Sequence, residues 1–129
     1  MKAVSLVATA LATLLSAPIA FGSEPNPVTE KFTDGCLLAT QSTDALRDAS
    51  SERKTYAVMC VTAANSSLQI AKSASRFKYL GVDVCVPPSA STTQLMHRIV
   101  SASAIETAKQ QNPADLVVLA LVDLYRCDG

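Results

Sequence analysis

The four cysteines, at positions 36, 60, 85 and 127, limit how this chain can fold more than any other feature. An even number of widely spaced cysteines in a small exported chain indicates two disulfides, whereas zinc and thioredoxin-like sites need close pairs such as Cys-x-x-Cys. Four cysteines allow three connectivities. Because disulfides persist only in oxidising compartments, we expect this chain to leave the cytoplasm.

The first 22 residues have the features of a secretory signal peptide. Lys2 precedes an apolar run from Val4 to Leu15 that is too short to span a bilayer, and Ala20-Phe21-Gly22 fits a small-x-small cleavage site. A retained membrane anchor is the alternative. We therefore expect cleavage before Ser23 and a mature exported chain that does not associate with the membrane once the signal is removed.

The charge of the mature chain excludes two classes of partner. Without Lys2, ten basic residues stand against eleven acidic ones, so the net charge is −1. Nucleic acid and anionic membranes both require a basic patch, and the sequence has none, so we expect neither as a partner. Residues 23 to 129 are enough for one domain with a modest core.

Hydrophobic periodicity predicts an all-α fold with four helices. Residues 23 to 31 are polar and proline-rich and are predicted to be a disordered lead-in, so the helical domain spans 32 to 129. The helices are predicted over 33–42, 51–73, from 91 or 92 to about 109, and from 113 to about 127. Residues 42 to 52 form a polar connection with at most a helical turn. Residues 75 to 91 are predicted to be irregular, with a short strand over 82–86 as the alternative.

Each of the longer helices has a recognisable apolar face or start. The second buries Ala57, Val61, Ala64, Leu68 and Ala71, flanked by Cys60, and the third buries Leu95, Ile99, Ala102 and Ile105. Asn112-Pro113 is the N-cap and first-turn proline of the fourth helix, and Ser91 or Thr92 caps the third. Residues 116 to 122 are all apolar, which indicates central burial or a covering partner; their β-branched members leave a strand as the alternative.

The order of the last two helices favours one pairing of the cysteines. Consecutive helices joined by a short link lie antiparallel, which brings Cys85, before the third helix, beside Cys127, at the end of the fourth. Cys36 would then pair with Cys60 and join the first two helices, although the other connectivities stay open. The expected fold is therefore a small four-helix domain stapled by two disulfides, Cys85–Cys127 and Cys36–Cys60.

A run of motifs near the C-terminus points to a family. The residues Cys85-Val86-Pro87, Gln94-Leu95, Pro113-Ala114, Leu116-Val117, Ala120-Leu121 and Cys127 follow in order without needing a gap. This pattern resembles the Rap/Tai family of periplasmic immunity proteins, which neutralise peptidoglycan amidases injected by type VI secretion. Leu37-Leu38 is similar to a step in the family's first helix. Residues 60 to 66 align with its Cys-x-Gly-Tyr-Ile-x-Gly step, with Thr62, Ala63, Ala64 and Ser66 in place of Gly, Tyr, Ile and Gly.

The resemblance implies a binding surface and a partner. Immunity proteins of this kind cover the active-site cleft of their amidase, usually with a protruding loop. The best candidate for that loop here is Arg76, Phe77, Lys78 and Tyr79, followed by Leu80-Gly81, because arginine and aromatic residues are typical interface anchors. The alternative is that Phe77 and Tyr79 only cap the core. The family also suggests a homodimer through residues 116–122, with a monomeric core helix as the alternative.

No arrangement of residues in the sequence indicates catalysis. His97 is the single histidine, and no G-x-S-x-G, phosphate-loop, haem or metal-ligand spacing occurs. We therefore expect no enzyme, no metal and no cofactor. The resulting hypothesis is a periplasmic immunity protein that binds and inhibits a peptidoglycan amidase effector delivered by type VI secretion. The alternatives are an acid-stress-type periplasmic chaperone, an orphan binding module of the same fold, and a small-ligand carrier.

Overall fold

The computed structural model describes residues 26–103 and 110–128. The predicted signal peptide, 1–22, and residues 23–25 of the predicted lead-in lie outside these ranges. Within them the chain forms five helices, four of them substantial, and one two-stranded hairpin. The elements are α2 (Pro27–Thr40), α3 (Thr43–Asp48), α4 (Ser51–Ala74), β1 (Arg76–Tyr79), β2 (Val82–Cys85), α5 (Thr92–Ala102) and α6 (Pro113–Tyr125).

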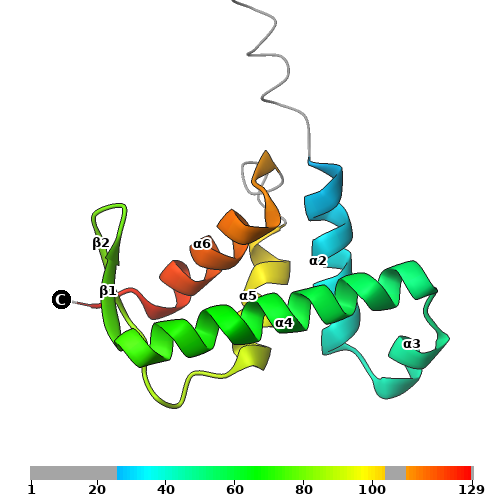
Figure 1. Cartoon of the computed structure of the whole chain (residues 1–129), viewed down its shortest axis with the longest axis horizontal. Helices are drawn as coiled ribbons and strands as arrows, with labels where there is room; N and C mark the ends of the chain where they lie inside the picture. Colours follow the sequence, from blue (N-terminus) through cyan, green and yellow to red (C-terminus); the bar gives the residue numbers. More distant parts are fainter. Residues whose placement is uncertain (1–25, 104–109, 129) are drawn as a thin grey trace, which may run out of the picture.

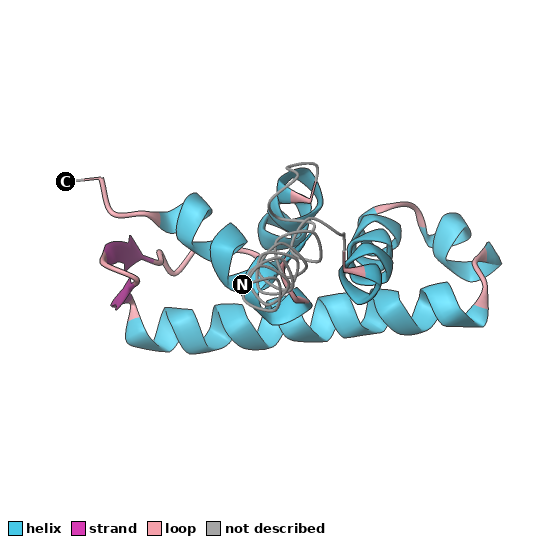
Figure 2. Ribbon diagram, turned by 90° about the horizontal axis from the view of Figure 1, so that it is seen from above, coloured by secondary structure: helices cyan, strands magenta, loops and turns pink. Residues whose placement is uncertain are grey.

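Helix α4 is the longest of the described helices, and most of the domain packs along it. Its 24 residues give it a length of ~36 Å, and α2, α5 and α6 all pack against it (Figure 1). Seen from above, these three helices lie in a row along one side of α4 (Figure 2). The hairpin follows the C-terminal end of α4, and the short helix α3 lies at the opposite end (Figure 1). The hairpin therefore occupies one extremity of the molecule.

The buried face of α4 is made mainly of small residues, which lets the other helices approach closely. Ala57, Cys60, Ala64, Leu68 and Ala71 are all buried. The sequence predicted this face correctly except for Val61, which is 41% exposed, because Cys60 takes the inward position instead. The rest of the core comes from α2, β2, α5 and α6 and includes Phe32, Val84, Leu95, Ile99, Leu116 and Val117.

Helix α2 begins earlier than predicted, so the prediction of disorder is wrong for residues 27 to 31. The Asn26 side chain accepts a hydrogen bond from the Val28 backbone N–H at 3.0 Å, and Pro27 occupies the first turn. This is the same start signal that the sequence carries at Asn112-Pro113. The extra turn buries Thr29, whose hydroxyl donates to the Gln111 carbonyl and so joins α2 to the segment before α6.

The prediction of a purely helical domain is corrected by the hairpin. Strands β1 and β2 pair antiparallel, with Tyr79 opposite Val82, over a segment predicted to be irregular. The short-strand alternative at 82–86 agrees with β2. The strands were hard to recognise because each has only four residues and the two-residue turn, Leu80-Gly81, is not a favoured turn pair.

The last two helices begin where the sequence predicted. The Ser91 hydroxyl accepts from the Gln94 N–H at 3.2 Å, and the Asn112 side chain accepts from the Asp115 N–H at 2.9 Å. Residues 116 to 122 are helical, so the strand alternative is wrong. Helix α5 ends at Ala102, whereas the predicted continuation to about 109, with Ile105 on its inner face, falls largely outside the described residues.

Both predicted disulfides are present. Cys36–Cys60 joins α2 to α4, and both cysteines are fully buried; we call it the buried disulfide. Cys85–Cys127 joins the end of β2 to the residues after α6, and both cysteines are half-buried; we call it the hairpin disulfide. It closes a loop with a sequence separation of 42, which in the chain-entropy account stabilises the fold by about 4 kcal/mol. Two disulfides indicate an oxidising, extracytoplasmic compartment.

Candidate functional site

The hairpin, residues 76–85, is fixed to the helical body at its base. The hairpin disulfide ties its last residue to the C-terminal segment. That segment also pairs with β2 through the bridge between Val84 and Arg126 and through the Cys127 N–H, which donates to the Asp83 carbonyl at 2.9 Å. The Val86 N–H donates to the Ser75 carbonyl, also at 2.9 Å. The hairpin is therefore anchored to the helical body at its base.

The four residues predicted to bind a partner lie on two different faces of the hairpin. Side chains alternate along a strand, so Arg76 and Lys78 are exposed while Phe77 and Tyr79 are half-buried against the core. Phe77 and Tyr79 therefore pack against the core, as the alternative interpretation of these two residues expected. Of the four, Arg76 and Lys78 are the two whose side chains are exposed on the outer face.

The outer face of the hairpin carries an excess of positive charge. Arg76 Nη2 and Lys78 Nζ each lie 3.9 Å from a different carboxylate oxygen of Asp83. One carboxylate therefore faces two cations, at distances near the limit for an ion pair and in contact with solvent. Such exposed pairs contribute little to stability, so both basic side chains can reorient toward a partner at small cost.

The tip of the hairpin exposes a large apolar side chain. Leu80 is 84% exposed, the most of any large hydrophobic residue in the described part of the chain. Its φ of +47° and the +80° of Gly81 give the two-residue turn the left-handed conformation of a type I′ turn. The sequence placed Leu80 in the candidate loop, but gave no reason to single it out.

Beneath the inner face of the hairpin lies a groove of about 430 Å³, which we call the apolar groove. It is lined by Ser67, Ile70, Ala71, Ala74, Phe77, Tyr79, Val118 and Leu121. The sequence analysis did not predict this groove. One signal could have indicated it: residues 55 to 71 of α4 contain no charged side chain, which is unusual for a helix with one face in solvent. Its volume lies within the range of small-ligand pockets.

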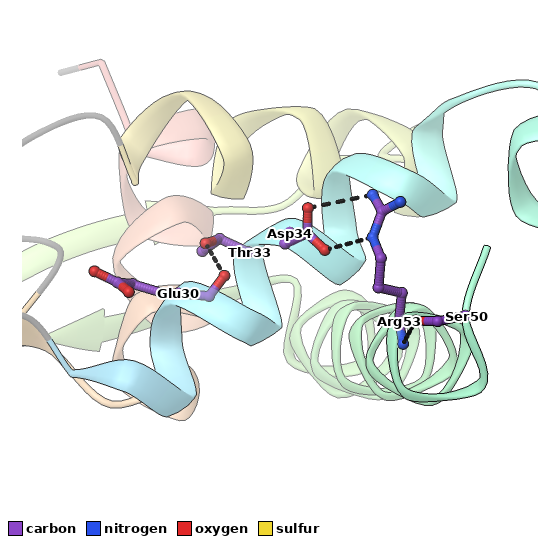
Figure 3. A network of polar contacts seen from close by, with 5 residues as sticks. All are labelled: Glu30, Thr33, Asp34, Ser50 and Arg53. Atoms are coloured by element: carbon purple, nitrogen blue, oxygen red, sulfur yellow. Dashed lines mark hydrogen bonds and ion pairs between the residues drawn. The ribbon is translucent and has the colours of Figure 1, made fainter.

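The polar groups at the other end of the molecule are mutually paired. Arg53 Nε lies 2.9 Å from Asp34 Oδ2, and its backbone N–H donates to the Ser50 hydroxyl that caps α4 (Figure 3). Lys31 Nζ lies 3.0 Å from Glu52 Oε1, and this hydrogen bond raises the pKa of Lys31. The contact to Asp34 likewise raises the pKa of Arg53. Both pairs join α2 to the first turns of α4 at the surface, where ion pairs contribute little to stability.

The single histidine lies on the surface of α5. His97 is exposed on α5, beside Arg98, which pairs with Asp123 of α6. The nearby Tyr125 hydroxyl lies 3.4 Å from the Gln94 side chain, and burial raises the pKa of Tyr125. Among residues 26–103 and 110–128, no three His, Cys, Asp or Glu side chains cluster closely enough to hold a metal ion. None of the helices described here is long and apolar enough to cross a membrane.

Comparison with models of known families, with curated proteins and with solved structures found no match.

Proposed function

We propose that this protein is a periplasmic immunity protein that binds one peptidoglycan amidase effector of type VI secretion and blocks its active-site cleft with the hairpin. The observation that carries the proposal is the hairpin itself. It is a disulfide-anchored projection at one extremity of the domain, and it presents two basic side chains and an exposed leucine. The motif resemblance of the last 45 residues to Rap/Tai proteins supplies the class of partner.

The shape of the hairpin suits insertion into an enzyme cleft. Two strands spaced about 4.8 Å apart make a projection narrow enough to enter a substrate groove. Because the base is held by the hairpin disulfide and by the backbone bonds of Val86 and Cys127, little conformational freedom is lost when a partner closes around the tip. Pre-organisation of this kind increases affinity without any additional contact.

The composition of the exposed face also supports a protein partner. Arginine is enriched at interfaces, and an apolar residue at the centre of a contact with charged residues around it is the usual layout. Leu80 lies at the tip, and Arg76 and Lys78 precede it on the outer face of β1. The two disulfides are consistent with the periplasm, which is oxidising and which also contains peptidoglycan, the substrate of the proposed partner.

The proposal is tested by titration calorimetry of the oxidised protein, residues 23 to 129, against candidate peptidoglycan amidases, with hydrolysis assayed in parallel. We expect nanomolar binding to one amidase and loss of its activity. The double variant Arg76→Gln, Lys78→Gln should weaken that binding by at least about tenfold, because each removed charge contact at an interface costs on the order of 1 kcal/mol.

A matched control separates the hairpin from a general charge effect. Arg47 on α3 has the same side-chain exposure as Arg76, 69%, but lies at the opposite end of the molecule (Figure 1). Arg47→Gln should leave both affinity and inhibition unchanged. If Arg47→Gln weakens binding as much as the hairpin variant does, the hairpin is not the contact surface. Absence of binding to every amidase would refute the proposed function.

The apolar groove favours a second candidate, an acid-stress-type chaperone that binds unfolded segments. Ile70, at the groove wall, is 72% exposed, and such surface suits apolar segments of many clients. This candidate predicts suppression of client aggregation at acid pH, without a preferred partner. Light scattering of acid-denatured clients distinguishes the two, because an immunity protein should have no effect in that assay. If the protein neither suppresses client aggregation nor binds any amidase, the remaining candidate is an orphan binding module of this fold.

A further inference from the structure

We propose that Leu80 is the anchor of the complex: its side chain inserts into an apolar pocket within the cleft of the partner enzyme. This inference rests on the proposed function and names the residue and the kind of pocket that would dominate the contact. It comes from the backbone conformation and the exposure of Leu80.

The backbone conformation of Leu80 is unfavourable for a leucine. At φ +47° its Cβ approaches the following carbonyl oxygen, a conformation that residues with a side chain rarely adopt, asparagine and aspartate excepted. Type I′ turns between two strands strongly prefer Asn-Gly. Gly81 occupies the second turn position, as the preference requires, whereas leucine at the first position departs from it.

Packing inside the protein does not compensate for that conformation. The Leu80 side chain is 84% exposed and does not belong to the core. Its neighbours Tyr79 and Val82, in contrast, pack against the core. A residue that is strained and also leaves its apolar side chain in water stabilises neither the turn nor the core. Strained residues cluster at functional sites, so a strained, exposed leucine at the tip points to a contact with a partner.

The surroundings of Leu80 define the pocket that it would fit. Leu80 lies in the turn, at the end of the hairpin away from its anchored base, so it would enter a cleft first. Arg76 and Lys78 follow on the outer face, and among the described residues Asp83 is the one carboxylate paired with them, so the rim of that pocket should be acidic. An apolar pocket with an acidic rim is therefore the complementary surface.

The experiment compares three single variants of the oxidised protein in thermal unfolding and in binding to the amidase that the wild-type protein inhibits. Leu80→Asn supplies the residue preferred by the turn and removes the apolar side chain. We expect its Tm to rise by about 2–5 °C while its affinity falls by about 30-fold. Leu80→Met keeps an apolar side chain of similar reach, so its affinity should stay within about threefold of the wild type.

The third variant, Val58→Asn, is the control. Val58 is 64% exposed on α4, and about 24 Å of helix separates it from Ala74 at the hairpin end, so its loss should leave the affinity unchanged. Equal affinities of Leu80→Asn and the wild type would overturn the anchor role while leaving the proposed function intact. A lower Tm for Leu80→Asn would overturn the argument from strain. Failure of the wild-type protein to bind any amidase would refute the proposed function and this inference together.

Discussion

Replacing Gly35 with alanine should destabilise the protein sharply, because α2 and α4 cross with almost no space at this residue. A Cβ built on Gly35 would lie 2.4 Å from the carbonyl carbon of Tyr56 and 2.7 Å from the backbone nitrogen of Ala57. Favourable contacts between such atoms need about 3.5–4.0 Å, so one helix backbone would have to move by roughly 1 Å. The buried disulfide begins at the next residue, Cys36, and opposes that movement.

The size of the effect follows from two opposing terms. Overpacking of a rigid backbone contact costs about 3 kcal/mol, at the upper end of the usual range, because no flexible side chain can give way. Alanine in place of glycine within a helix recovers about 1 kcal/mol. The net loss of about 2 kcal/mol in the free energy of unfolding corresponds to a decrease of about 10 °C in Tm for a domain of this size.

The assay is thermal and urea unfolding of the oxidised protein followed by far-ultraviolet circular dichroism. Ser66→Ala, at an exposed position on α4, is the control for a change in helix propensity alone, and it should alter the free energy of unfolding by less than about 0.5 kcal/mol. Gly35→Ala with a Tm equal to or above that of the wild type would refute the close crossing of α2 and α4.

Three further outcomes follow from the structure. The hairpin disulfide should be reduced before the buried disulfide in native conditions, because only its cysteines are partly exposed; thiol labelling with mass spectrometry would show the order, and the reverse order would contradict this assignment. Asn26→Ala should lower the free energy of unfolding by about 1 kcal/mol through loss of the α2 cap, measured by urea unfolding; an unchanged midpoint would mean that α2 does not start there. The raised pKa of Tyr125 means that its contribution to stability is complete below about pH 10 and is lost as pH rises through the folded-state pKa; Tyr125→Phe should flatten the alkaline decline in Tm, and an unaltered decline would count against its burial.

Much of the helical fold could be predicted from the sequence because its signals are local. The N-cap and proline at Asn112-Pro113, the cap at Ser91 and the apolar run of α6 each define a helix over a few residues. Helix order favoured the observed disulfide pairing without excluding the others, because antiparallel neighbours bring Cys85 beside Cys127 and leave Cys36 for Cys60. These features need no knowledge of distant contacts.

The parts that the sequence did not predict depend on contacts between distant segments. Strands of four residues acquire their conformation only when β1 finds β2 and the C-terminal residues close the base. Helix α2 starts at Pro27 partly because Thr29 and Phe32 have a core to enter. The closeness of Gly35 to Tyr56 is a property of two helices and is not visible in either one.

The sequence identified the segment that forms the candidate site, but not which of its side chains are exposed. The sequence identified residues 76 to 81 by their arginine and aromatic content, yet only the strand geometry separates Arg76 and Lys78 from Phe77 and Tyr79. The exposed, left-handed conformation of Leu80 depends on the register of the hairpin, which no local pattern in the sequence specified.

The measurement that tests the central claim most directly is hydrogen exchange of the protein alone and in mixture with the amidase proposed as its target. The account predicts slower exchange of backbone amides in peptides covering residues 76 to 83, with no change in α3 at the opposite end. Slower exchange in α3 with an unchanged hairpin, or no amidase that the protein inhibits, would contradict it.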